Sequence, residues 1–180
     1  MRKLFFGIAA AGALFTGTPG NADDLSHTVN LTANVPLTCA FTGPINSSGL
    51  SDVMEGDSQF AVDVSPGKAR DQNASLSYAN VYCNGNSATV KLEGKGLKNS
   101  ATTTNQTLKT KVEYVADVSW GGTNGIVQLD TRTTPDGVVT QVVPARSGNF
   151  ILTIHIPESD GPFLAGQYTD ALILTVTPTT

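Results

Sequence analysis

Cysteine and histidine are the residue types best suited to carry chemistry in this chain of 180 residues, and each occurs only twice. Cys39 and Cys83 predict one disulfide if the chain is exported, because a lone thiol pair in an oxidising compartment is most often oxidised. His27 and His155 have no companion ligands nearby, so a zinc or copper site would need ligands gathered from scattered residues. We expect neither a metal nor a cofactor.

Catalytic motifs are missing from the sequence. No GxSxG elbow, phosphate-binding loop or HExxH pair occurs. A hydrolase triad needs a histidine within reach of a nucleophile and a carboxylate. His155, however, alternates with Ile154 and Ile156 and is most simply a solvent-facing strand residue. We therefore expect that the chain is not an enzyme.

Two further clusters have both a binding interpretation and a plainer one. An acidic cluster could bind calcium but lacks the EF-hand spacing, so a solvated acidic loop is the simpler interpretation. Four aromatic residues could form a sugar platform, but they occupy strand positions, which favours core or cross-strand packing. The acidic cluster is Asp52, Glu55 and Asp57, and the aromatic residues are Tyr78, Tyr82, Tyr114 and Trp120.

Residues 1–22 predict a secretory signal peptide. A basic MRK is followed by the apolar run LFFGIAAAGALF and by the small residues of TGTPGNA, the order that signal peptidase cleaves. The apolar run is too short for a transmembrane helix, which needs about 20 residues. We expect cleavage after Ala22, export of the chain, and a mature chain that is not membrane-embedded.

The expected mature chain is acidic. Removal of Arg2 and Lys3 leaves nine Lys and Arg against fifteen Asp and Glu, a net charge of −6. With no basic run, such a domain is poorly suited to bind phosphate backbones, so we expect no nucleic-acid partner.

Alternating apolar residues predict an all-β fold of six to eight short strands separated by turn-rich segments. An Asn84–Gly85 turn inside VYCNGNSATVKL predicts a β-hairpin. The expected strands cover residues 60–64, 81–83, 88–92, 112–120, 150–156 and 172–176. The expected turn-rich segments cover residues 42–57, 94–105, 121–125, 131–137 and 157–166, and KNSATTTNQT is expected to be an exposed loop.

The segment HTVNLTANVPLTC alternates in the same way before the first cysteine. Its apolar face belongs either to an ordinary first strand or to another molecule, and Pro36 marks either the end of a donated segment or a kink within a self-contained sandwich. The apolar positions are Val29, Leu31, Ala33, Val35 and Leu37.

Four segments resemble the pilin subunits of archaic chaperone–usher pathways, the family that also carries the spore-coat-U domain. They are the arm VNLTANVPLTC, the second cysteine in VYCNGNSATVKLEG, the tyrosine strand KVEYVADVSW and the C-terminal GPFLAGQYTDALILTVTP. The C-terminal pattern Gly-x-Tyr-x-Asp followed by an alternating strand is the most specific. The resemblance spans nearly the whole mature chain and is weaker from Gly43 to Asn73.

This resemblance implies an incomplete immunoglobulin-like β-sandwich over residues 38–180, preceded by a donor-strand extension over residues 23–37. The donor strand would carry Val29, Leu31, Ala33, Val35 and Leu37, and the acceptor groove would include Leu172, Leu174 and Val176. A periplasmic chaperone would fill the groove first, and the arm of a neighbouring pilin subunit would replace it at an outer-membrane usher. The implied function is that of a structural pilus subunit, exported through the periplasm to the cell surface and serving adhesion or biofilm formation.

A self-contained secreted β-sandwich that binds glycans or surfaces is the alternative. The arm separates the two hypotheses, because a pilin polymerises through residues 27–37 whereas a self-contained module needs them for its own fold.

Overall fold

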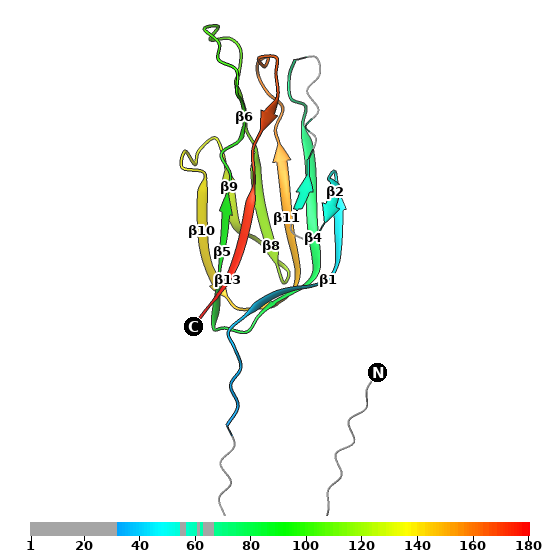
Figure 1. Ribbon diagram of the computed structural model, residues 1–180, viewed down its shortest axis with the longest axis vertical. Coiled ribbons are helices and arrows are strands. Elements are labelled where there is room, and N and C mark those ends of the chain that lie inside the picture. The colour runs from blue at the N-terminus through cyan, green and yellow to red at the C-terminus, as the bar shows by residue number, and fades with distance from the viewer. Residues whose placement is uncertain (1–31, 55–56, 61, 63–66) are drawn as a thin grey trace, which may run out of the picture. The chain divides into compact units, whose positions relative to one another are not determined.

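The computed structural model describes residues 32–54, 57–60, 62 and 67–180 (Figure 1). The chain divides into two units, Met1–Asn34 and Val35–Thr180, and the second holds the strands. The described residues contain no helix, so the expected all-β class is confirmed.

The second unit is a β-sandwich built from two main antiparallel sheets. Five strands form one sheet in the order β1 (Cys39–Ser48), β4 (Gln72–Cys83), β11 (Ser147–Ile156), β8 (Val115–Trp120) and β9 (Thr123–Asp130). Three strands form the other in the order β10 (Val138–Pro144), β5 (Ser87–Glu93) and β13 (Ile173–Thr179). Two small sheets comprise β12 (Tyr168–Thr169), β6 (Leu97–Asn99) and β7 (Lys111–Val112), and β2 (Ser51–Met54) with β3 (Asp57–Gln59).

The core lies between the two main sheets, because alternate residues of each strand point toward the other sheet. Trp120 is fully buried, and its ring meets that of Phe150 edge to face at 5.7 Å. The Trp120 indole Nε1–H donates to the Val81 carbonyl at 3.2 Å, so the one polar atom of this ring is satisfied. The fully buried Leu92 and Val90 of β5 belong to the same core from the other sheet.

The expected hairpin at Asn84–Gly85 is wrong. β4 pairs with β1 and β11, whereas β5 pairs with β10 and β13, so the two halves of VYCNGNSATVKL lie in different sheets. The chain crosses from one sheet to the other here because Val81 and Val90 both bury their side chains in the common core. A true two-residue hairpin occurs instead at Gly121–Gly122, where both φ angles are positive (58° and 80°), as a type I′ turn requires.

The expected turn segment 42–57 is also wrong, because β1 continues to Ser48 and β2 and β3 follow. The polar stretch NSS is a strand because β4 pairs with it along its length, and such pairing overrides weak β-propensity. The expected strand 60–64 is wrong at Phe60 and Val62, which lie outside the strands but pack against the core; Val64 lies outside the described residues.

The loops over residues 131–137 and 157–166 are free of named strands, as expected, and residues 100–107 form a mostly exposed loop. The loops expected over residues 94–105 and 121–125 are shorter in the structure, because β6 lies within the first segment and β9 begins within the second. Tyr114 and Trp120 are buried and Tyr78 is half-buried, as packing predicts, but Tyr82 is exposed.

Candidate functional site

Burial across the five-stranded sheet is uneven, and this locates the candidate site. Val118 in β8 is fully buried, and its cross-strand partner Leu152 in β11 is nearly so. The next partner along the same row, Leu76 in β4, is only half-buried although its strand lies inside the sheet. In β4 the core-facing Leu76 and Tyr78 are therefore less buried than Ala74 and Val81 on either side of them.

An aromatic cluster marks this thinly covered side. Phe41 of the edge strand β1 is 40% exposed although it packs on the core side of its sheet. Its ring centroid lies 4.8 Å from that of Tyr78 and 5.7 Å from that of the fully buried Phe150. The cluster is thus buried at one end and open to solvent at the other.

The three predicted groove residues belong to β13 of the three-stranded sheet or directly precede it. Leu174 and Val176 of β13 are half-buried, whereas their cross-strand partners Leu92 and Val90 in β5 are fully buried. Leu172, just before β13, is half-buried in the same way. In the described residues β13 pairs only with β5 and β1 only with β4, so both are edge strands, and they contact each other.

We call the core-facing, incompletely covered side chains between these two edges the open strip. Its members are apolar or aromatic and come from both sheets, and sequence reasoning missed those of β1, β4 and β11. Their alternation was visible, but their exposure depends on which strands face them. The strip comprises Phe41, Leu76, Tyr78, Ile154, Leu172, Leu174 and Val176.

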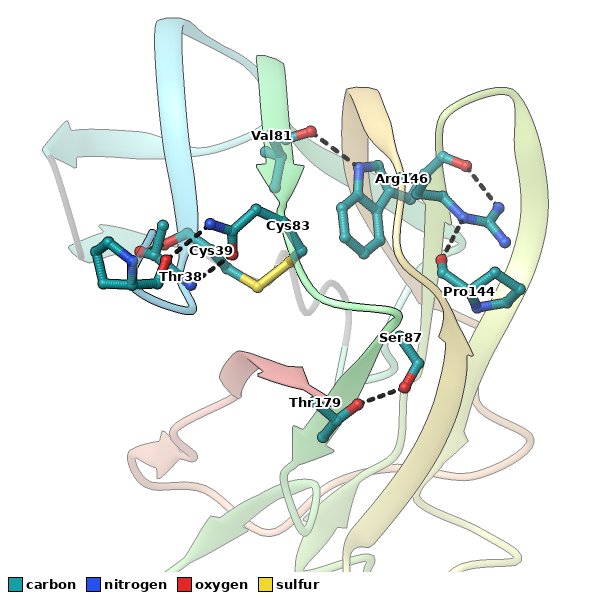
Figure 2. Close-up of a disulfide and its surroundings, with 11 residues drawn as sticks. Thr38, Cys39, Val81, Cys83, Ser87, Pro144, Arg146 and Thr179 are labelled. Carbon is teal, nitrogen blue, oxygen red and sulfur yellow. Dashed lines mark hydrogen bonds between the residues drawn. A yellow bond between two sulfur atoms is a disulfide. The ribbon is translucent and has the colours of Figure 1, made fainter. Parts of the chain in front are cut away.

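The segment that precedes β1 is anchored through one asparagine. The Asn84 side chain accepts from the Thr38 backbone N–H at 2.7 Å and donates to the Pro36 carbonyl at 2.8 Å. The Asn84 backbone N–H donates to the Thr38 carbonyl at 3.1 Å. These bonds and the adjacent disulfide between Cys39 and Cys83 hold the residues before β1 against the segment in which the chain passes from β4 to β5 (Figure 2). The predicted cysteine pairing is confirmed.

The predicted donor residues are not buried where the structure describes them. Val35 is 74% exposed and Leu37 is 45% exposed, and Ala33 is exposed as well. Val29 and Leu31 lie outside the described residues. In a self-contained sandwich, apolar residues that alternate along a first strand are expected to be buried.

A buried tyrosine ties the approach to β13 to the rest of the sandwich. The Tyr114 hydroxyl donates to Asp170 Oδ2 at 2.7 Å, and the same oxygen accepts from the backbone N–H groups of Lys95 and Gly96 at 2.9 and 2.8 Å. Burial and the neighbouring Asp170 carboxylate raise the pKa of Tyr114 well above the ordinary value for tyrosine. Asp170 is the aspartate of the Gly-x-Tyr-x-Asp pattern, so this pattern positions the chain before the edge strand β13.

A separate cavity of about 320 Å³ lies beside β7 and the loop over residues 157–163. The three cationic side chains in its lining are each paired with a carboxylate. Lys109 pairs with Asp160, whose carboxyl pKa it lowers; Lys111 pairs with Glu113 at 2.8 Å; and Arg132 binds Asp130 at 2.7 Å through Nη2. Each of these three cations is therefore engaged by a carboxylate and is not free to converge on an anionic ligand.

The remaining chemical candidates stay dispersed. His155 is on the outer face of β11, where Nε2 lies 3.2 Å from Asp71 Oδ1. The acidic side chains of residues 52, 55 and 57 lie outside what the structure describes. Within the described part of the chain, no group of His, Cys, Asp and Glu could hold a metal ion, and no helix is long and apolar enough to span a membrane.

A scan against protein-family models and a search of curated proteins both find no match for this chain.

Proposed function

We propose that the chain is a structural subunit of a chaperone–usher pilus, polymerised by donor-strand exchange, with an immunoglobulin-like sandwich that lacks its last strand. The observation that carries this proposal is the open strip, whose core-facing side chains stay partly exposed between the two edge strands β1 and β13. A strand added beside β13 would extend the three-stranded sheet and cover the strip.

The arm has the features that such a strand requires. A donor adds ladder hydrogen bonds to an edge, and every second side chain enters the core. Five anchors at every second position span about 27 Å, and the seven residues of β13 span about 20 Å, so the arm is long enough to pair with the whole edge strand. Val35 is exposed on its own subunit and is therefore available to a neighbour. The Leu37 side chain is exposed as well, although Asn84 of the same subunit binds the backbone on both sides of it.

The expected energy supports a long-lived contact. Burial of four Val or Leu anchors contributes roughly 6–12 kcal/mol before the costs of association and ordering. Because the donor and acceptor surfaces are different parts of the chain, the contact is head-to-tail and does not close, so repetition builds a fibre.

The same surface gives a periplasmic chaperone a physical role before assembly at an usher. Before assembly, the exposed edges and the apolar open strip would promote aggregation, which a periplasmic chaperone would prevent by occupying the strip. The predicted signal peptide and the disulfide are compatible with an exported chain. Such a subunit has a structural role in adhesion or biofilm formation and needs no catalytic centre or cofactor.

The test compares two charge-matched variants of the arm. The host cells carry the genes of the chaperone and usher partners and export the chain. Leu31→Asp with Val35→Asp places two carboxylates at anchor positions, whereas Thr32→Asp with Asn34→Asp places the same charges at the alternate positions of the same segment. The assay is an SDS gel of unboiled and boiled surface material.

We expect the wild-type chain and the Thr32/Asn34 variant to give a ladder of multimers that collapses on boiling, and the Leu31/Val35 variant to give monomer. Monomer in every lane would instead favour the self-contained binding module. A ladder that survives in the Leu31/Val35 variant would show that the arm is not the donor.

A further inference from the structure

The outer face of the three-stranded sheet has an unusual composition. We call it the threonine face; it is formed by the side chains that alternate with the buried Ala88, Val90 and Leu92 in β5, together with their neighbours in β10 and β13. Across its rows Val142, Thr89 and Thr177 are neighbours, and so are Thr140, Lys91 and Thr175. Its other members are Val138, Glu93, Ile173, Pro144, Ser87 and Thr179.

The threonine face carries no net charge although the chain as a whole has a net charge of −4. Its only charged side chains, Lys91 and Glu93, pair with each other at 2.9 Å and are each about one third exposed. The remaining polar groups are hydroxyls, and the Ser87 and Thr179 hydroxyls are hydrogen-bonded to each other at 2.5 Å. Two copies of this acidic chain can therefore meet at these faces without bringing unpaired like charges together.

The face also exposes apolar atoms on stiff side chains. Val142 is 58% exposed, and Val138 and Ile173 are exposed as well. Two valines, one isoleucine and five threonines make most of the face β-branched. Because β-branched side chains have few χ1 rotamers, little side-chain entropy is lost when they are covered by a second sheet.

We propose that the threonine face is a lateral interface at which copies of this chain in neighbouring fibres pack sheet against sheet. Its size explains why a polymer is needed. Three strands about 4.8 Å apart and about 20 Å long cover roughly 290 Å². A stable interface buries about 800 Å² per partner, so isolated subunits would not pair. Repetition along two fibres makes each further contact intramolecular, and weak contacts then add up.

This inference rests on the proposed function, because it requires the polymer. Donor-strand exchange would also widen the face, since the added strand lies beside β13 and its residues between the anchors would point outward. Thr32 and Asn34 are two such residues, and both are uncharged.

The test uses assembled surface fibres of the wild-type chain and of three variants. Val142→Glu adds a charge to the threonine face, and Val142→Thr keeps that face neutral and β-branched. Ile151→Glu is the matched control, since Ile151 is an exposed β-branched residue on the outer face of the other sheet. Bundling is measured by light scattering and negative-stain electron microscopy at rising ionic strength, and polymerisation by the SDS ladder.

We expect all four chains to give the ladder. Fibres of wild type, Val142→Thr and Ile151→Glu should bundle increasingly as salt screens the net charge. The bundled fraction of Val142→Glu fibres should be at least about tenfold smaller. Three results would overturn the interface while leaving the polymer intact: wild-type fibres that stay single at every ionic strength, Val142→Glu fibres that bundle like wild type, or equal loss in Ile151→Glu. Single wild-type fibres that bind an apolar surface through Val142 would assign the face to that surface. An absent wild-type ladder would refute the polymer and this interface together.

Discussion

Reduction of the disulfide between Cys39 and Cys83 should destabilise the sandwich by about 4 kcal/mol. The two cysteines are 44 positions apart and face each other where β1 begins and β4 ends. In the chain-entropy model, opening a loop of this length restores about 4 kcal/mol of conformational freedom to the unfolded chain. The cross-link also retains β1, which in the described structure has a single neighbouring strand.

Urea unfolding of oxidised and reduced protein measures this difference directly. Trp120 is the only tryptophan of the chain and is fully buried, so its fluorescence reports opening of the core without an added label. The measurement uses the Leu31→Asp, Val35→Asp variant, because the proposed donor-strand exchange would otherwise polymerise the chain. With a slope of roughly 2 kcal/mol per molar urea, the midpoint should fall by about 2 M on reduction.

Treatment of the oxidised protein with a thiol alkylator is the control, because neither cysteine is free and its midpoint should not move. A shift below about 0.5 M on reduction would refute the reasoning, since it would mean that the unfolded chain gains little freedom from the open loop.

Two further predictions concern substitutions of Tyr114 and of two glycines with positive φ angles. The raised pKa of Tyr114 means that the folded state keeps a proton that the unfolded chain loses above about pH 10, so the free energy of unfolding is intact below that pH and falls above it. Tyr114→Phe should reduce the loss between neutral and strongly alkaline pH by on the order of 1 kcal/mol in urea titrations, and an identical alkaline decline in both proteins would contradict this assignment. Gly122 and Gly137 both have positive φ angles (80° and 66°), but an added Cβ meets nothing within 4 Å at Gly122 and lies 2.5 Å from the Gly94 carbonyl oxygen at Gly137. Gly122→Ala should cost about 1 kcal/mol and Gly137→Ala about 3 kcal/mol in thermal unfolding, and equal costs would show that the carbonyl contact relaxes.

Much of the fold was accessible from the sequence because it depends on local patterns. Period-two alternation is a property of neighbouring residues, so the strands ending at Trp120 and Ile156 and the last strand were predictable. The cysteine pairing followed from having two thiols and a predicted signal peptide.

The sheet to which each strand belongs was not accessible in this way. The Asn-Gly pair at residues 84 and 85 has hairpin chemistry, yet the chain crosses between the sheets there because the residues on both sides bury in one core. The polar stretch Asn46–Ser48 became a strand only because β4 lies beside it. Both outcomes depend on partners far away in the chain.

The candidate site divides in the same manner. The sequence by itself determined the alternating apolar positions of the arm, the uncharged outward residues of β13 and the aspartate at position 170. Only the tertiary structure decided that Asp170 meets Tyr114, that Asn84 binds both Pro36 and Thr38, and that Phe41 and Leu76 stay partly uncovered. The physical reason is that alternation fixes which way a side chain points within its strand, whereas exposure depends on whether another strand lies opposite.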